Sequence, residues 1–317
     1  MDRAALITAL AADDFSAFYS EADDVRRRAV GDTVHIRAIL EFSNHCSRRC
    51  GYCGLSAYNR TLARYRMTPS DIIETGKRAA DAGYKTLVLQ SGEDGFFDAE
   101  KLGNIVSALA RTGLAVTLSV GELSDEAYAH LKDCGAARYL LKHETAAPEI
   151  YKALHPGNTL DSRIRCLRSI KRLGYECGSG FMIGLPGQTL ETIADDILLL
   201  AKLRCDMAGI GPFIPHPSTP LRDVPHGSCE LCRRAVALTR IVMPKINLPA
   251  TTSLGVLSSD ERRLVFGGGA NVIMQKVTPE PYKSLYEIYP SNSGETDIIR
   301  ERRELEAFIR SLDRQPL

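Results

Sequence analysis

Short apolar runs recur along the chain and alternate with longer segments whose apolar residues return at helical spacing. The eight runs lie at residues 34–42, 86–90, 115–120, 137–141, 177–183, 207–211, 248–250 and 271–273. One helical segment is well bounded, because Thr68 can cap it, Pro69 suits its first turn and Gly83 can stop it. Strands that alternate with helices in this way predict an α/β fold, a full parallel (β/α)8 barrel.

The two ends of the chain lie outside this repeating pattern. Residues 1–20 carry several acids and only a brief apolar run, so we expect an amphipathic helix and not an export signal. We assign residues 1–30 to an N-terminal helical extension, 31–290 to the barrel and 291–317 to a C-terminal helix or tail. No apolar run approaches the ~18 residues that a membrane span requires, so no membrane partner is expected.

Composition narrows the class of protein further. A hydrophobic fraction of 44% and a charged fraction of 25% are ordinary for a globular protein, and 317 residues allow a substantial core. The net charge is only +1, so the sequence does not indicate a nucleic acid or an acidic membrane surface as a partner. The nine cysteines are odd in number, scattered and not preceded by a secretory signal, which favours a reducing cytoplasm.

The candidate chemistry is concentrated in residues 42–53, at the end of the first apolar run. Cys46, Cys50 and Cys53 stand there as C-x3-C-x2-C, which is a metal-ligand spacing. Thiolates select zinc, copper(I) or iron-sulfur clusters, and three of them would leave one iron of a four-iron cluster open for chemistry. The alternative is a structural zinc site with His45 as the fourth ligand, although a residue adjacent to Cys46 is sterically awkward for the same ion.

This spacing, with the aromatic Tyr52 before the last cysteine, resembles the signature of the radical S-adenosylmethionine (SAM) enzymes. The resemblance implies a 4Fe-4S cluster on the three cysteines, whose open iron chelates the amino and carboxylate groups of SAM. It also implies that an electron from the cluster splits SAM into methionine and a 5'-deoxyadenosyl radical. A reductant such as ferredoxin or flavodoxin would supply that electron. The cores of such enzymes are full or partial barrels, which the strand pattern predicts independently.

The inner faces of the predicted strands are unusually polar. Side chains alternate along a strand, and the outer face of each barrel strand has to be apolar to meet the helices. The remaining, inward-facing positions include Arg37, Glu41, Gln90, Thr117, Ser119, Arg138, Lys142 and Glu144. Buried charges without partners are costly, so we expect a ligand cavity, and the excess of basic groups suggests a negatively charged ligand. The alternative is that these groups pair with one another inside a filled core.

Several segments at the ends of strands resemble SAM-binding segments. The turn at residues 90–93 is similar to the family's Gly-Gly-Glu segment, whose backbone binds the amino group of SAM. Glu144 and Arg163 match positions that hold SAM in related enzymes, and the glycines of residues 180–187 would allow close approach to the adenine. The candidate cofactor-binding residues are therefore Tyr52, Gln90, Ser91, Gly92, Glu93, Thr117, Ser119, Glu144, Arg163 and Met182.

Longer segments resemble one family of this superfamily in particular, the FeFe-hydrogenase maturase HydE family. They lie at residues 39–44, 64–67, 87–94, 138–145, 182–189, 209–217, 249–252 and 269–272. The resemblance implies a small, anionic, sulfur-containing substrate: a cysteine-derived iron complex with carbonyl and cyanide ligands, on the way to the hydrogenase H-cluster. It also implies other hydrogenase maturation proteins as partners. The residues that it places at the substrate are Arg138, Met207, Thr251, Thr252 and Tyr286, together with Tyr289.

The chain departs from that family at a few positions. Lys142 stands where an arginine is expected, which keeps the charge but loses the planar fork of the guanidinium. Cys177 replaces a threonine and invites comparison with biotin synthase, in which a cysteine near this strand ligates a second cluster. A methylornithine synthase-like or biotin synthase-like enzyme with a different substrate is therefore the alternative function. A non-catalytic iron-sulfur or zinc scaffold protein is the alternative from another class.

Overall fold

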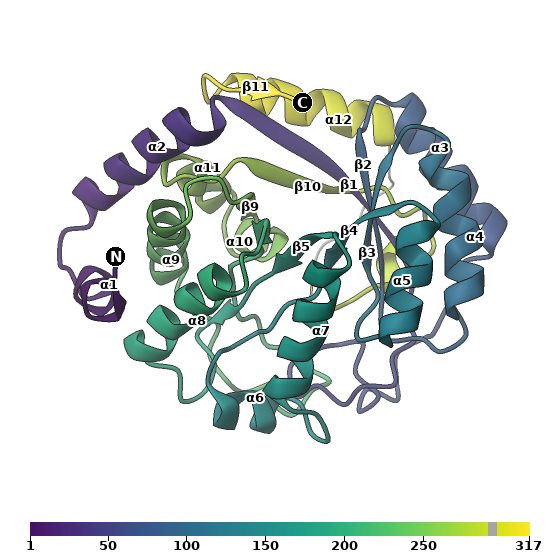
Figure 1. Cartoon of the computed structure of the whole chain (residues 1–317), viewed down its shortest axis with the longest axis horizontal. Helices are drawn as coiled ribbons and strands as arrows, with labels where there is room; N and C mark the ends of the chain where they lie inside the picture. Colours follow the sequence, from purple (N-terminus) through teal and green to yellow (C-terminus); the bar gives the residue numbers. More distant parts are fainter. Residues whose placement is uncertain (291–296) are drawn as a thin grey trace.

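The computed structural model describes residues 1–290 and 297–317, and in Figure 1 a sheet of parallel strands curves inside a ring of helices. Eight strands of the described chain form one continuous path: β1 (Thr33–Ser43), β2 (Thr86–Ser91), β3 (Ala115–Ser119), β4 (Ala136–Leu140), β5 (Glu176–Ser179), β7 (Met207–Ala208), β9 (Pro249–Ala250) and β10 (Val272–Lys276). Their order in the sheet is β7-β5-β4-β3-β2-β1-β10-β9, and every neighbouring pair is parallel.

The sheet is nearly closed into a barrel, because main-chain hydrogen bonds bridge the gap between β7 and β9. The Ala208 N–H donates to the Asn247 carbonyl (3.0 Å), and the Asn247 N–H donates to the Asp206 carbonyl (2.9 Å). The predicted parallel (β/α)8 barrel is confirmed. The fifth and sixth predicted runs are each interrupted, and their ends form a separate short pair, β6 (Met182–Ile183) and β8 (Gly211–Pro212).

Helices cover the outside of the barrel. They are α3 (Pro69–Asp81), α4 (Ala99–Ala110), α5 (Asp125–Asp133), α6 (Pro148–Leu154), α7 (Leu160–Arg172), α8 (Leu190–Lys202), α9 (Cys229–Val242), α10 (Thr252–Leu257) and α11 (Ser259–Gly267). α3 begins as predicted, since the Thr68 hydroxyl accepts from the Asp71 N–H (3.2 Å) and Pro69 is the first helical residue. Gly83, at φ +93°, follows its end and allows the left-handed turn there.

The N-terminal segment differs from the single helix expected for residues 1–20. It forms two helices, α1 (Arg3–Leu10) and α2 (Ser16–Val30). The break has a local cause, because the Asp14 carboxylate accepts from the Ser16 N–H (2.9 Å) and so satisfies a main-chain donor at the start of α2. Phe15 at the break is 3% exposed and packs against Phe18 and Tyr19. The prediction of one continuous helix was therefore wrong.

The C-terminal segment returns to the first strand. A 3-10 helix, η1 (Lys283–Leu285), precedes residues 291–296, and the boundary that we predicted at residue 291 lies outside the described residues. Beyond them α12 (Ile298–Arg310) leads to β11 (Gln315–Pro316), which pairs in parallel with the beginning of β1. Figure 1 shows α12 and β11 beside β1.

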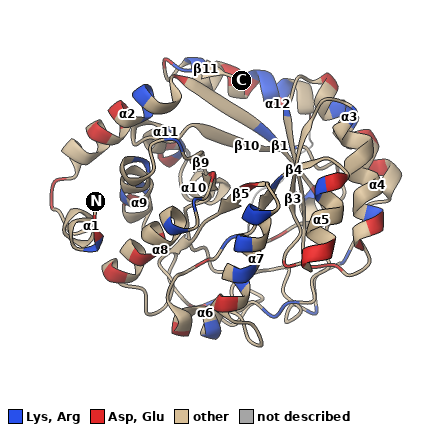
Figure 2. Ribbon diagram, viewed as in Figure 1, with Lys and Arg blue, Asp and Glu red and all other residues tan. Residues whose placement is uncertain are grey.

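The surface of the molecule carries both signs of charge. In the view of Figure 2, acidic and basic residues are interspersed along the outer helices. Among the helices that the structure describes, none combines the length and the apolar character needed to cross a bilayer.

Alternation along β1 separates the two faces of the sheet. Ile36, Ala38 and Leu40 are at most 2% exposed and belong to the core that the sheet shares with the helices. Burial of an aliphatic side chain of this size stabilises the fold by about 1.5–3 kcal/mol. Ile39 and Glu41 instead line a cavity inside the barrel. The predicted division of this strand into an apolar outer face and a partly polar inner face is therefore confirmed.

Candidate active site

A cavity of about 250 Å³ lies inside the barrel, at the carboxyl ends of the strands. Its wall contains many of the predicted site residues, namely Tyr52, Gln90, Glu144, Met182, Met207, Thr251, Thr252, Tyr286 and Tyr289. Candidates for the cofactor and candidates for the substrate thus border the same space, although they come from distant parts of the sequence. We call this space the main cavity.

The charged groups of the main cavity are balanced. Glu41 pairs with Lys276 (3.0 Å), and Glu144 pairs with Lys142 (2.9 Å). These four are the charged residues of its wall among the described residues, so the excess of positive charge predicted for the interior is not found here. Lys276 was missing from the sequence-based count because β10 extends beyond the predicted run at 271–273. The charged groups therefore pair with one another, as the alternative expected, but they border a cavity and not a filled core.

The pKa values of the two cavity carboxyl groups, Glu41 and Glu144, are shifted in opposite directions. It raises the pKa of Glu41, and the attraction of Lys276 only partly offsets this effect. Burial also acts to raise the pKa of Glu144, but the charge and the hydrogen bond of Lys142 outweigh it, and the pKa lies below its ordinary value. Glu144 therefore remains a carboxylate that can accept hydrogen bonds from a ligand.

Arg138 and Thr117 do not line the main cavity. With Arg37 they line a second, smaller cavity of about 10 Å³, which we call the lower cavity. The Arg138 guanidinium pairs with Glu176 (2.5 Å) and donates to the Thr86 hydroxyl (3.0 Å). Arg138 is the third residue of β4, so it lies nearer the amino end of the barrel than the substrate candidates around the main cavity.

Met207 forms part of the wall of both cavities. Its side chain is 5% exposed, and its sulfur lies 2.9 Å from the Nη1 of Arg37. The Met207 side chain therefore lies between the main cavity and the two arginines of the lower cavity, Arg37 and Arg138.

The three cysteines lie in the loop that follows β1. Cys46, Cys50 and Cys53 are free thiols, partly exposed, and near enough that their charges influence one another. Burial raises the pKa of all three thiols, to about 12 for Cys53, so the thiolates need a metal to stabilise them. These soft donors fit an iron-sulfur cluster. Among the described residues, no three His, Cys, Asp or Glu side chains surround a single metal ion, so the structure does not show the zinc site with His45. A four-iron cluster does not require such a common position, because each cysteine binds a different iron.

The cysteine loop is fixed by a single arginine and by close backbone approaches. The Arg64 guanidinium donates to the main-chain carbonyls of residues 44, 55, 56 and 59. The Glu93 N–H donates to the Cys46 sulfur (3.4 Å). A Cβ at Gly92 would lie 2.3 Å from the His45 carbonyl oxygen, so only glycine allows this turn to approach the loop. The predicted SAM-binding turn and the predicted cluster loop are therefore in direct contact.

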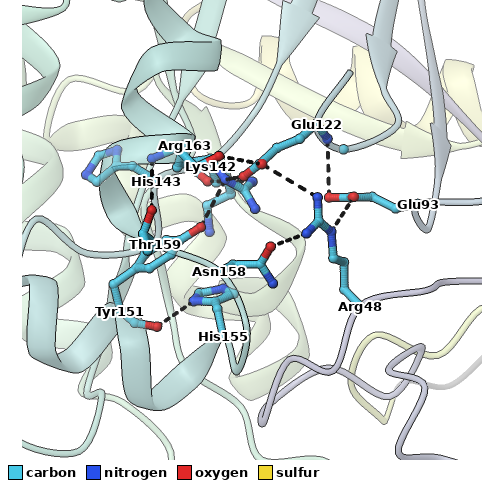
Figure 3. A network of polar contacts seen from close by, with 12 residues as sticks. Arg48, Glu93, Glu122, Lys142, His143, Tyr151, His155, Asn158, Thr159 and Arg163 are labelled. Carbon is cyan, nitrogen blue, oxygen red and sulfur yellow. Dashed lines mark hydrogen bonds and ion pairs between the residues drawn. The ribbon is translucent and has the colours of Figure 1, made fainter. Parts of the chain in front are cut away.

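A network of ion pairs joins these elements (Figure 3). Arg48, from the cysteine loop, binds the Glu93 carboxylate and the Asn158 side chain, and its Nη2 lies 3.5 Å from Glu122. Glu122 also pairs with Arg163 (2.8 Å). Sequence reasoning singled out Glu93 and Arg163 but missed the other three. No local pattern marks them, because their partners are distant in the sequence.

A second group of contacts supports Tyr52. Its hydroxyl lies 3.1 Å from the Nε2 of His155, whose ring stacks on Tyr151 with ring centres 4.1 Å apart. Burial lowers the pKa of His155 to about 4, so the ring is neutral near pH 7. The Nδ1 lies 3.0 Å from the Tyr151 carbonyl, which can only accept, so Nδ1 carries the hydrogen and donates it. The Nε2 is therefore free to accept a hydrogen bond from the Tyr52 hydroxyl. His155 was also not predicted from the sequence.

The remaining candidates lie around the rim of the main cavity. Ser91 and Glu93 line a neighbouring pocket of about 270 Å³, and Gly92 adjoins the cysteine loop. Ser119 ends β3 in register with Gln90. Arg163, on α7, donates to the Lys142 carbonyl (3.2 Å) and to the Tyr151 hydroxyl (3.2 Å). Arg163 therefore adjoins the Lys142–Glu144 pair of the main cavity.

Comparison with known proteins gives consistent matches. Residues 40–200 match the radical SAM superfamily. The chain is 50% identical to the FeFe hydrogenase maturase subunit HydE of Thermotoga maritima over 274 residues, which is 86% of this chain and 79% of that protein. It is 26% identical to 3-methylornithine synthase of Methanosarcina barkeri, over 93% of this chain and 83% of that protein.

Solved structures match the fold along the whole chain. The crystal structure of a methylornithine synthase superposes with a TM-score of 0.85 at 24% identity, and covers 100% of this chain and 94% of that one. The maturase HydG of Carboxydothermus hydrogenoformans also gives a TM-score of 0.85, at 19% identity, over 100% of this chain and 76% of that one. The chain thus belongs to the radical SAM superfamily, whose enzymes use a 4Fe-4S cluster and SAM, and within it to the FeFe-hydrogenase maturase HydE family.

Proposed function

We propose that the protein is a maturase that acts on a small, sulfur-containing, cysteine-derived iron complex during assembly of the hydrogenase H-cluster. The observation that carries the proposal is the main cavity, whose wall contains candidate residues for SAM together with candidate residues for the substrate. The 50% identity with a hydrogenase maturase supports the assignment to this pathway.

In this proposal, Cys46, Cys50 and Cys53 bind the 4Fe-4S cluster. When bound, the cluster and SAM supply the 5'-deoxyadenosyl radical. SAM would be held by the turn at residues 90–93, by Glu144 and Arg163, and by Tyr52 and Met182 beside the cavity. Glu144 suits this role because it keeps its charge in the site, and the Nη2 group of Arg163, which makes no hydrogen bond with the described residues, can donate to a ligand carboxylate. Ser119, at the end of β3, would contribute beside Gln90, whereas Thr117 lines the lower cavity and is not part of this SAM site.

The substrate would occupy the part of the main cavity near Met207, Thr251, Thr252 and Tyr286, with Tyr289 beside them. Hydroxyl groups in an otherwise largely apolar wall can orient a compact ligand by hydrogen bonds, and Lys142 and Lys276 can attract anionic ligand atoms. Arg138 would act on the substrate only across Met207, from the lower cavity. The barrel would hold the substrate close to SAM and exclude water and stray hydrogen donors, which a carbon radical requires.

The reaction needs partners. An external one-electron donor such as ferredoxin or flavodoxin would reduce the cluster, and other hydrogenase maturation proteins would deliver the substrate or receive the product. Arg49 and Arg60 of the cysteine loop are exposed and, in the described chain, have no carboxylate partner, so they could attract an acidic carrier protein. The free thiols suit a reducing cytoplasm as the compartment.

The balanced charges of the main cavity favour one second candidate. Two acids and two lysines also suit a zwitterionic amino acid, the chemical class of the product named for 3-methylornithine synthase. An enzyme of that type would have the same SAM site and a different substrate.

Anaerobic reconstitution tests the proposal. We expect about four irons per chain, an electron paramagnetic resonance (EPR) signal that changes when SAM is added, and deoxyadenosine formation that rises with the iron complex supplied by the other maturases. Hydrogenase activated in that mixture would support the proposal. Deoxyadenosine formation that responds to an amino acid and not to the iron complex would contradict it and favour the second candidate.

A further inference from the structure

Glu122 holds two arginines with its two carboxylate oxygens (Figure 3). It lies just after β3 and its side chain is 9% exposed. Its Oε1 pairs with the Nε of Arg163 (2.8 Å). Its Oε2 lies 3.5 Å from the Nη2 of Arg48 and accepts a hydrogen bond from the Ser162 hydroxyl (3.2 Å). One buried carboxylate therefore joins three segments of the chain.

The two arginines belong to different parts of the site. Arg48 stands between Cys46 and Cys50, and it also binds Glu93 of the candidate SAM-binding turn. Arg163 stands on α7 and is the candidate for the SAM carboxylate. Two similar charges near each other repel, and a shared carboxylate is the usual way to hold them together in a buried site.

The contacts of Arg163 leave one end of its guanidinium available. Glu122 and the Tyr151 hydroxyl both bind the Nε edge, and the Lys142 carbonyl accepts from Nη1 (3.2 Å). The Nη2 group makes no hydrogen bond with the described residues. Glu122 thus fixes the plane of the guanidinium from its Nε edge and leaves the Nη2 group as a donor for a ligand carboxylate.

We propose that Glu122 is a positioning residue: it holds Arg163 and Arg48 in a fixed relation, so that the clamp for the SAM carboxylate stays aligned with the cysteine loop. The inference rests on the proposed function, because it assumes that Arg163 binds SAM. Glu122 itself does not line the main cavity. Its loss should therefore weaken SAM binding without removing the cluster.

The test compares Glu122→Gln with the wild-type protein, both reconstituted anaerobically. Glutamine keeps the shape but removes the charge that attracts both arginines. We expect the SAM dissociation constant, from titration of the EPR change, to rise by about 10- to 100-fold, as for other residues that orient a ligand. Iron content and the EPR spectrum without SAM should stay those of the wild type. The KM for SAM should rise in parallel, and kcat at saturating SAM should change by less than about threefold.

Two further variants make the outcome unambiguous. Glu122→Asp keeps the charge on a shorter side chain, so it should restore part of the affinity for SAM and serves if Glu122→Gln fails to fold. Asp195→Asn removes an ion pair of similar length, with Arg3 (2.6 Å), between the outer helices α1 and α8, and should change nothing.

Three results would overturn the inference. Wild-type affinity for SAM in Glu122→Gln would show that the carboxylate does not position Arg163. Loss of iron from Glu122→Gln with normal folding would show that it serves cluster retention instead. Absence of any SAM effect in the wild-type protein would overturn the proposed function as well, and this distinguishes the two failures.

Discussion

Met207 divides the interior of the barrel into two spaces of different character. The main cavity measures about 250 Å³ and borders the cysteine loop, whereas the lower cavity measures about 10 Å³ and encloses little more than the side chains that line it. In each cavity a basic residue from β4 or the loop after it pairs with an acid. Lys142 pairs with Glu144 in the main cavity, and Arg138 pairs with Glu176 in the lower cavity. The same kind of pair therefore borders a ligand-sized cavity at the carboxyl end of the strands and packed side chains near the amino end.

The largest expected effect is the loss of activity when a cysteine of the loop beside the main cavity is replaced. Cys50→Ala removes one of three ligands to the cluster, and we expect it to abolish deoxyadenosine formation because two thiolates cannot hold an active cluster. Chromatographic measurement of deoxyadenosine under reducing conditions checks this outcome. Cys229→Ala, at the start of α9 and far from the loop in sequence, is the control and should keep activity. Robust deoxyadenosine formation by Cys50→Ala would refute the cluster assignment.

Replacing the acidic partner in each cavity tests whether only the main cavity takes part in catalysis. Glu144→Gln removes a charge that is only 12% exposed from the main cavity, and we expect kcat/KM for SAM to fall by about 100-fold or more. Glu176→Gln breaks the corresponding pair below, where the carboxylate is 51% exposed, and should cost less than about 1 kcal/mol of folding stability. Steady-state kinetics and urea unfolding of both variants check these values. Equal loss of activity in the two variants would mean that the lower cavity also takes part in catalysis.

Met207→Ala would join the two cavities. The lost packing should lower the free energy of unfolding by about 2–4 kcal/mol, and substrate turnover per deoxyadenosine should fall because the substrate is held less tightly. Met274→Ala is the matched control, since Met274 lines the main cavity only and is partly exposed. Urea unfolding and the ratio of product to deoxyadenosine measure both effects. If Met207→Ala keeps the wild-type ratio, Met207 does not confine the substrate.

The sequence allowed prediction of features that depend on neighbouring residues. The cap at Thr68 and the alternation in β1 each involve residues that are close in sequence, and the structure contains both as expected. These local signals were sufficient to predict the barrel. They also placed the candidate cofactor residues at strand ends, where a barrel encloses its ligands.

The predictions that failed depended on distances along the strands or on distant partners. The positive excess predicted for the interior is not found in the main cavity because Arg37 and Arg138 line the lower cavity instead, and the position of Arg138 along the barrel depends on where β4 begins. Glu122 was missed because its partner Arg48 is distant in the sequence and only the closed barrel brings them together. Pairs of this kind leave no pattern in a single sequence.

The last expected effect is a pH dependence from two histidines, His155 beside Tyr52 and His35 at the beginning of β1. Burial lowers the pKa of His155 from 6.5 to about 4, so between these values the unfolded chain binds more protons than the folded one. Stability should therefore be complete above about pH 6.5 and should decline by up to about 3 kcal/mol as the pH falls toward 4. His155→Gln should flatten this slope in urea unfolding measured across the range.

His35, near the beginning of β1, provides a second histidine for comparison because it is only half-buried. Burial and then the charge of Arg37 lower its pKa, so its contribution has the same sign as that of His155: present at neutral pH and lost on acidification. Water screens a half-buried group more effectively, so His35→Gln should change the slope less than His155→Gln does. The opposite order would mean that the lower end of the barrel, and not the contacts around Tyr52, dominates the acid sensitivity of the fold.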